Sequence, residues 1–187
     1  MSTLEVNTIN PQSGTTITIG GSGDTVSLGS GATQSGFGGV MTPYFHVYLG
    51  SDQSVTSGAT SKVQFNTEVY DSNTNYDNST NYRFTPTVAG KYYFYTSVVY
   101  YADADNFNFN KVSIRLNGSA IAGGEADSRF GRGRQYSASC SCIQEMNGSS
   151  DYVEVYSFVQ SNGASSHFES DNKATFFGGY KLITWAY

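Results

Sequence analysis

The sequence FTPTVAGKYYFYTSVVYY, residues 84–101, decides the fold. After Pro86 and Gly90, which interrupt regular structure, residues 92–101 are almost all aromatic or β-branched, and such side chains fit a pleated strand better than a helical turn. The two faces of this strand carry Tyr92, Phe94, Val98 and Tyr100 on one side and Tyr93, Tyr95, Val99 and Tyr101 on the other. Because both sets are apolar, we predict a strand that is covered on both sides. The core of a sandwich can cover the first set, and we predict that the second set lies at a subunit interface.

Composition and charge narrow the class of protein. The 187 residues include 21 Gly, 15 Tyr and 12 Phe, and only 13% are charged, which is typical of an all-β chain with many turns. The net charge of −5 argues against non-specific binding to nucleic acid. No apolar run is long enough to cross a bilayer, so we expect no membrane insertion. The opening MSTLE lacks the basic and apolar segments of a signal peptide, which predicts synthesis in a cytoplasm.

Short strands at turn-punctuated intervals predict a β-sandwich or jelly roll over residues 41–187. Besides 92–101, the expected strands are 44–49, 62–65, 82–85, 111–116, 135–143, 152–159 and 174–185. The Asn117-Gly118 pair predicts a hairpin turn after the strand 111–116. We expect the strand 152–159 to pair with 135–143 across the polar turn 147–151.

Residues 1–28 differ from the rest of the chain. They contain no Lys or Arg, and turn-forming groups separate short β-like pieces at 3–9, 15–19 and 24–28. This rhythm predicts a stalk of β-rungs that folds only when several chains wind together. A disordered tail is the alternative, although alternating Ile, Val and Leu are unusual in such segments. Residues 29–40 are predicted to be a Gly-rich linker to the head at 41–187.

The opening TLEVNTI of residues 3–9, followed by the SGTT turn of residues 13–16, resembles segments of structural proteins from tailed phages, particularly marine ones. This resemblance covers about thirty residues. It implies a virion protein that is anchored to other virion proteins through its N-terminal stalk.

The head resembles the C1q/TNF-like globular domain. The pattern of that family is matched at Phe65, Asp71, Tyr76, Phe84, Gly90, Tyr92 and Phe94, and later elements are echoed at residues 150–153 and 176–182. One extra residue lies between Tyr76 and Phe84, and Thr96 stands where an aromatic residue is usual. The resemblance implies an antiparallel jelly roll that forms a homotrimer.

The segment SRFGRGRQ, residues 128–135, concentrates three arginines in an acidic protein. Arg129, Arg132 and Arg134 could bind the anionic groups of a partner protein or of a phosphorylated or carboxylated glycan. The aromatic side chains of Phe107, Phe109 and Phe130 could stack on sugars, and together these six residues are the predicted receptor site. The alternative is a solvated loop whose arginines pair with nearby acids.

Few residues point to metal binding or catalysis. Cys140 and Cys142 would share one face of a strand, which suits buried free thiols better than a disulfide. His46 and His167 lie in no metal-ligand pattern. The acid pairs Asp103/Asp105 and Glu125/Asp127 are expected in solvated loops, although the C1q resemblance also allows Ca²⁺ at Asp103 and Asp105. Apart from that ion we expect no cofactor.

These observations predict a non-enzymatic phage virion protein. We expect a trimeric tail fibre, head fibre or decoration protein whose head binds a host-surface glycan or protein, located on the virion after synthesis in the host. One alternative is a soluble oligomeric module that binds glycans or proteins. Another is a glycan depolymerase, but such enzymes need a carboxylate pair in a groove, and the short head offers no clear one.

Overall fold

A computed structural model describes residues 8–27, 29–32, 41–102, 107–128, 133–162 and 166–183. The chain divides into two units, Met1–Gly38 and Gly39–Tyr187. The described residues of the first unit form turns and no strand, and they leave Ile9, Ile17, Ile19 and Val26 exposed. The predicted stalk would fold only when several chains wind together. The structure of a single chain does not test it, so it stays a prediction. No helix within the described ranges is long and apolar enough to span a membrane.

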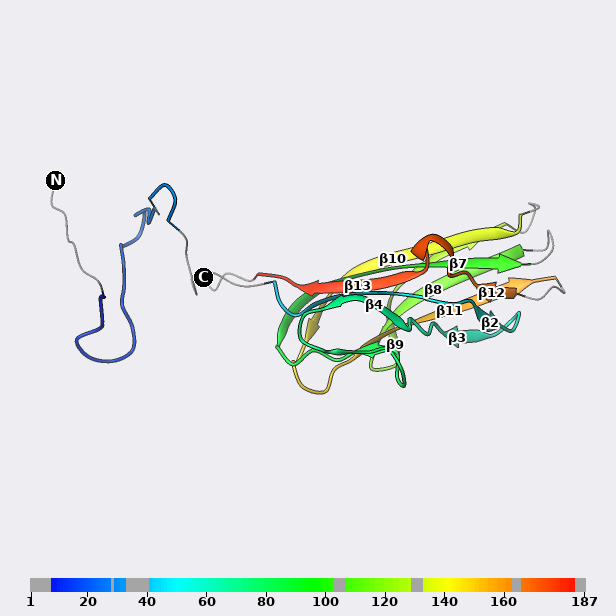
Figure 1. Cartoon of the computed structure of the whole chain (residues 1–187), viewed down its shortest axis with the longest axis horizontal. Helices are drawn as coiled ribbons and strands as arrows, with labels where there is room; N and C mark the ends of the chain where they lie inside the picture. Colours follow the sequence, from blue (N-terminus) through cyan, green and yellow to red (C-terminus); the bar gives the residue numbers. More distant parts are fainter. Residues whose placement is uncertain are drawn as a thin grey trace. The chain divides into compact units, whose positions relative to one another are not determined.

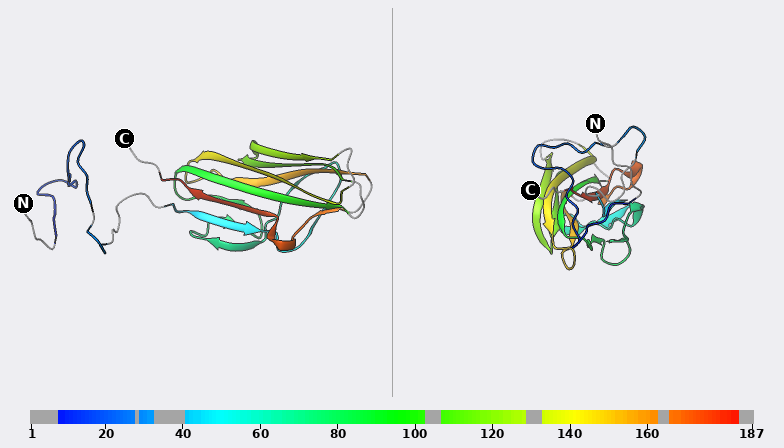
Figure 2. Two further views of the ribbon diagram at one scale, coloured as in Figure 1. Left: turned by 90° about the horizontal axis from the view of Figure 1, so that it is seen from above. Right: turned by 90° about the vertical axis from the view of Figure 1, so that its left-hand side faces the viewer.

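The second unit, the head, consists of two antiparallel sheets that pack face to face (Figures 1 and 2). Sheet A contains β1 (Tyr44–Tyr48), β2 (Gln53–Val55), β4 (Thr67–Asp71), β7 (Gly90–Ala102), β10 (Gln135–Met146), β12 (Ser166–Phe168) and β13 (Phe176–Lys181). Sheet B contains β3 (Thr60–Lys62), β5 (Tyr76–Asp77), β6 (Arg83–Phe84), β8 (Phe107–Leu116), β9 (Ser119–Asp127) and β11 (Val153–Ser161). The short 3₁₀ helix η1 (Asp171–Lys173) precedes β13.

Strand β7 is central to sheet A, as the aromatic run predicts. It pairs with β10 along nearly its whole length on one side and with β13 and β12 on the other. The side chains of Tyr92, Phe94, Val98 and Tyr100 are fully buried between the sheets. Thr96 also points into the core, where its hydroxyl donates to the carbonyl of Phe176 at 2.7 Å, so a polar side chain is satisfied at this position.

The predicted hairpin at Asn117-Gly118 is confirmed. Both residues have positive φ values, 49° and 85°, which match the twist of the flanking strands. The turn leads from β8 into β9, a strand that the sequence did not predict. The expected loop position of Glu125 and Asp127 was therefore wrong: both lie on β9, where Glu125 is opposite Lys111.

The predicted pairing of 152–159 with 135–143 was also wrong. Strand β10 pairs with β7 in sheet A, whereas β11 pairs with β8 in sheet B. The turn between them carries the chain from one sheet to the other. The side-chain oxygen of Asn147 accepts hydrogen bonds from the backbone N–H groups of Ser149, Ser150 and Asp151, and this network holds the turn. Gly148 lies so close to the backbone of Ala89 that a Cβ would be 2.2 Å from it.

Candidate interaction surface

The outward side of sheet A carries a continuous set of aromatic rings, which we call the aromatic face. Strands β1, β4, β7 and β13 supply its residues: Tyr44, His46, Tyr70, Tyr93, Tyr95, Phe176 and Tyr180. Strand alternation places these side chains opposite the core, because their sequence neighbours Phe45, Phe94 and Phe177 are fully buried. The register of β1, β13 and β7 then brings rings from distant parts of the sequence side by side.

Ring contacts run across the aromatic face from strand to strand. Tyr93 lies 5.6 Å from Tyr180 and 6.0 Å from Tyr95, measured between ring centroids. Phe176 lies 6.1 Å from Tyr95 and 5.6 Å from His46. Such distances are typical of aromatic pairs that stabilise one another. The rings therefore form a preorganised surface rather than a set of independent side chains.

A polar contact fixes the centre of this surface. His46 Nδ1 lies 3.1 Å from the Tyr95 hydroxyl, within hydrogen-bonding distance. Burial raises the pKa of Tyr95 to about 12, with a smaller contribution from Tyr70. Burial also lowers the pKa of His46, and the charge of Lys173 adds to this effect. Both groups are thus neutral at physiological pH, which suits a surface that becomes covered.

A trough of small side chains lies beside the aromatic rings. The middle outward positions of β10 are Ser137, Ser139 and Ser141, all exposed, and the exposed Ile143 follows them on the same side. A hollow of about 410 Å³ lies between Ser139 and Ser141 on one side and Tyr95 and Phe176 on the other. A second hollow of about 250 Å³ is lined by Tyr44, Tyr70, Tyr95 and Tyr180 among others. The head thus presents a ridge of rings next to a depression that rings could fill.

The predicted trimer-interface residues lie on this outward side but differ in what they expose. Tyr93 and Tyr95 are half-buried members of the aromatic face. Val99 is only 6% exposed in the single chain, so it offers little surface to a partner. Tyr101 lies at the far end of β7, where its ring stacks 5.0 Å from His167 and the Arg134 guanidinium lies 5.4 Å from the ring centroid.

The predicted receptor residues are not brought together within the described ranges. Arg129, Phe130 and Arg132 lie outside those ranges. Phe107 is 1% exposed and stacks on Tyr136 at 4.3 Å, so it belongs to the core and the prediction of a receptor contact there was wrong. Phe109 is half-buried on β8, beside Phe158 and a hollow of about 390 Å³. Arg134 is exposed just before β10.

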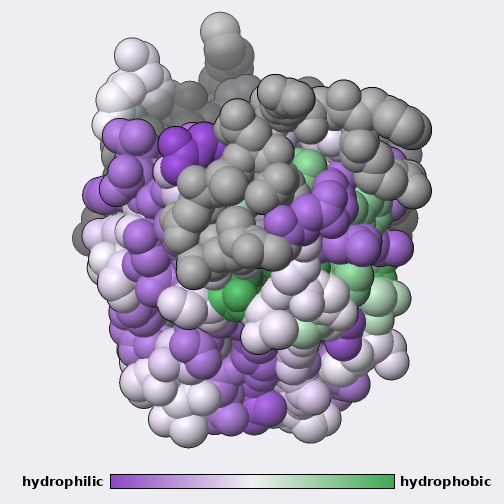
Figure 3. Space-filling view, turned by 90° about the vertical axis from the view of Figure 1, so that its right-hand side faces the viewer, coloured by the Kyte–Doolittle hydropathy of each residue, from purple (hydrophilic) through white to green (hydrophobic). Residues whose placement is uncertain are grey.

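Figure 3 views the head from the end at which β7 finishes. Its described surface is largely hydrophilic, with apolar residues in smaller areas.

The predicted Ca²⁺ ligands Asp103 and Asp105 lie outside the described residues. The two cysteines are free and half-buried, and they pack against the core. Burial raises the pKa of Cys140 and raises that of Cys142 to about 11, so both are protonated thiols at neutral pH.

One cluster that could hold a metal ion was missed by the sequence analysis. Asp52, His167 and Glu169 each direct one ligand atom toward the others, and these atoms all lie within 4.8 Å of one another. His167 and Glu169 are two residues apart on an extended segment, so their side chains point to the same face of that segment. Nothing in the sequence indicated that Asp52 joins them.

Solved structures with a similar fold support the architecture. The globular domain of zebrafish complement 1qA protein matches with a TM-score of 0.56 and 15% identity, over 76% of this chain and 98% of that one. Murine APRIL at pH 5.0 matches with a TM-score of 0.53 and 16% identity, over 74% of this chain and 98% of that one. No protein-family model and no curated protein matches the sequence. The fold is the C1q/TNF-like jelly roll that the spaced motifs predicted.

Proposed function

We propose that the head is a non-enzymatic binding module that assembles as a homotrimer through the aromatic face. The observation that carries this proposal is that each chain presents both an aromatic ridge and, next to it, a trough lined by serines. A ridge on one copy can enter the trough of the next. Such a head-to-tail contact uses two different surfaces, and it closes into a ring when the rotation permits. The C1q/TNF-like fold supports a ring of three copies.

We further propose that this trimer is a phage virion protein. The phage-like opening at residues 3–9 supports this, together with the separate N-terminal unit that could join other virion proteins. The assembled particle would carry the head outward, where it binds a host-surface glycan or protein. Detection of the chain by mass spectrometry in purified particles would support this location, and its absence from particles that infect normally would contradict it.

The receptor surface proposed for this role consists of Arg129, Phe130 and Arg132 together with Arg134 and Phe109. Replacement of the three arginines by glutamine should weaken attachment to host cells while the unfolding temperature stays unchanged. The Ca²⁺ site at Asp103 and Asp105 also remains a proposal. Calcium should then raise the melting temperature, and a chelator should lower it.

Light scattering on the full-length chain tests the assembly. We expect a particle with three times the chain mass of 20.2 kDa. Tyr93→Glu and Tyr180→Glu each place a charge in the aromatic face, so each should give monomers because burying an unpaired carboxylate is costly. Tyr156→Glu is the matched control, since Tyr156 is a half-buried tyrosine on the outward side of sheet B.

Three outcomes would contradict assembly through this face. The first is a monomeric wild type, and the second is equal dissociation by Tyr156→Glu. The third comes from a truncated chain that begins at Val40. If this chain is monomeric while the full-length chain is trimeric, the N-terminal unit rather than the aromatic face holds the copies together.

A further inference from the structure

We propose that Asp52, His167 and Glu169 form a binding site for one divalent transition-metal ion, with Zn²⁺ as the best-fitting ion. This site is separate from the aromatic face and does not depend on the proposed function. It lies where β2 and β12 extend sheet A beside the end of β7.

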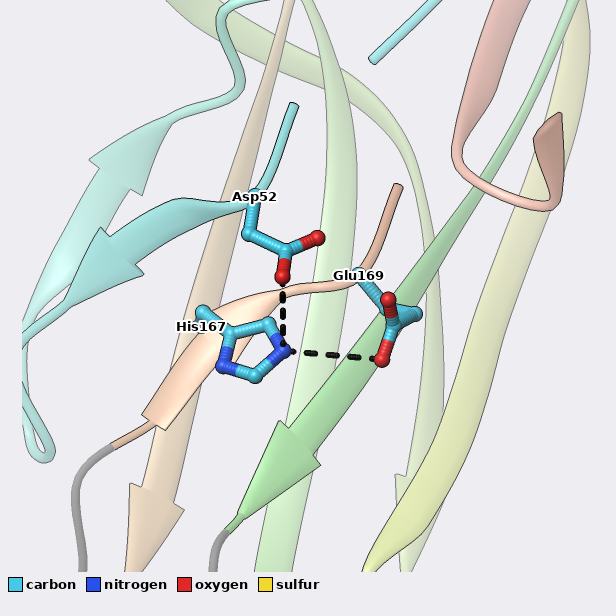
Figure 4. Close-up of side chains that lie close together, drawn as sticks. All are labelled: Asp52, His167 and Glu169. Atoms are coloured by element: carbon cyan, nitrogen blue, oxygen red, sulfur yellow. Dashed lines mark ion pairs between the residues drawn. The ribbon is translucent and has the colours of Figure 1, made fainter. Parts of the chain in front are cut away.

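Strand geometry brings the three side chains together (Figure 4). His167 points away from the core, because the flanking Phe168 and Ser166 are buried on the other side of β12. Glu169 follows two residues later on the same side. Asp52 immediately precedes β2, which pairs with β12 so that Gln53 is opposite Phe168. Both carboxylates therefore face the imidazole.

The distances favour a shared cation over a direct hydrogen bond. His167 Nε2 lies 3.5 Å from Asp52 Oδ2 and 3.5 Å from Glu169 Oε2. Hydrogen bonds between such atoms are shorter, about 2.7–3.2 Å, and one ring nitrogen carries at most one hydrogen. Two ligand atoms bound about 2.1 Å from a tetrahedral Zn²⁺ are separated by about 3.4 Å. The observed spacing matches that of ligands arranged around an ion.

Other residues hold the second oxygen of each carboxylate. Asp52 Oδ1 accepts hydrogen bonds from the backbone N–H of Ser170 at 2.9 Å and from its hydroxyl at 2.7 Å. Glu169 Oε1 accepts from the backbone N–H of Asp171 at 3.3 Å. Tyr101 stacks on the imidazole and restrains its plane. Contacts of this kind orient the ligands of metal sites.

Charge and exposure indicate the kind of ion. Two of the three proposed ligands are carboxylates, and both direct an oxygen toward the imidazole of His167. Glu169 is only 9% exposed, so a cation beside it would offset the cost of burying its charge. One imidazole and two carboxylates suit Zn²⁺, whereas Ca²⁺ requires six to eight oxygen ligands. The Asp52 side chain is 48% exposed, so solvent can reach the site and supply a fourth ligand.

Calorimetric titration of the untagged full-length chain with Zn²⁺ tests the proposal. We expect one ion per chain and a higher melting temperature in its presence. His167→Gln should weaken Zn²⁺ binding by more than about tenfold, and Ser170→Ala, which removes only a donor to Asp52, by about tenfold. Asp52→Asn provides a second ligand variant at an exposed position, where the fold should tolerate the change.

Two controls address the other possible Zn²⁺ ligands. His46→Gln removes the other histidine of the chain, and Cys140→Ser with Cys142→Ser removes both thiols. All of these should bind Zn²⁺ as the wild type does. The proposal is overturned if the wild type binds no Zn²⁺, if folded His167→Gln and Asp52→Asn bind it unchanged, or if the cysteine variant loses it.

Discussion

The outward sides of the two sheets differ in what contacts their aromatic residues. On sheet B, cations from the same chain lie over half-buried rings: Arg115 is 4.2 Å from the centroid of Tyr156, and Arg83 is 4.2 Å from that of Tyr152. The cations near tyrosines of sheet A contact Tyr48 and Tyr101, which are not part of the aromatic face. On sheet A, the rings of the aromatic face stack mainly on one another. Both sheets consist of strands from one sandwich. They therefore differ here in which side chains their strands point outward.

This difference indicates on which side of the head the aromatic rings already have charged partners from the same chain. Sheet B covers its aromatic rings with hydrated arginines and joins Lys62 to Glu154 in an ion pair of 2.5 Å. A second protein would have to displace these contacts. Sheet A offers uncharged rings and serines, and removing water from uncharged groups costs less than removing it from charged ones. Self-association is therefore expected at sheet A.

The largest expected effect comes from breaking the ion pair on sheet B. Glu154 is 4% exposed, and Lys62→Met would leave its buried carboxylate without this ion-pair partner, with Arg83 and Arg115 opposite it on the neighbouring strands. Removal of one partner of a buried pair costs about 3–5 kcal/mol, and the partial exposure of Lys62 should reduce this to about 2–3 kcal/mol. Urea unfolding would measure the loss.

A double variant checks the cause of that loss. Lys62→Met combined with Glu154→Leu removes both charges and should recover much of the stability. If the double variant is as unstable as Lys62→Met alone, the cost comes from lost packing and not from an unpaired charge. Light scattering should find the assembly of both variants unchanged, because the pair lies away from the aromatic face.

A smaller effect is expected from a methyl group under the aromatic face. At Gly178, a Cβ would lie 2.5 Å from the end of the Tyr95 ring, so Gly178→Ala forces this ring to move. We expect a loss of about 1–2 kcal/mol and weaker assembly. Gly123→Ala on β9 is the matched control, since its Cβ would meet only the carbonyl of Val112 at 3.2 Å. Equal losses in the two variants would contradict a special role for the Tyr95 ring.

Local chemistry made part of this architecture predictable. Residues 92–101 have apolar side chains on both faces, and the turn at Asn117-Gly118 requires positive φ, so the central strand and one hairpin followed from the sequence. The pairing of β11 was not predictable, because the polar turn 147–151 resembles a hairpin loop. In the structure this turn changes sheets, and burial of the inward side chains on each sheet decides the partner.

The candidate sites were less predictable because they depend on register between distant strands. The aromatic face could be foreseen on β7, but its partners His46, Phe176 and Tyr180 join it only through the pairing of β1, β13 and β7. Phe107 was wrongly assigned to the receptor site because β8 begins at this residue, earlier than the alternating segment at 111–116 that predicted the strand. Asp52 reaches His167 through the pairing of β2 with β12, which no local pattern encodes.

The smallest expected effect is a pH dependence at the centre of the aromatic face. Burial lowers the pKa of His46 below its usual 6.5, so the unfolded chain binds a proton at this residue that the folded chain resists. The free energy of unfolding should therefore fall as the pH drops below about 6.5. Urea unfolding of wild type and His46→Gln above and below this pH isolates the contribution of His46, because the other histidine of the chain, His167, is present in both proteins. If His46→Gln shows the same decline as the wild type, the imidazole beside Tyr95 is not the source. If its decline is smaller, the neutral imidazole beside Tyr95 stabilises the aromatic face. Sheet B has no corresponding group, because both histidines of the chain lie on strands of sheet A.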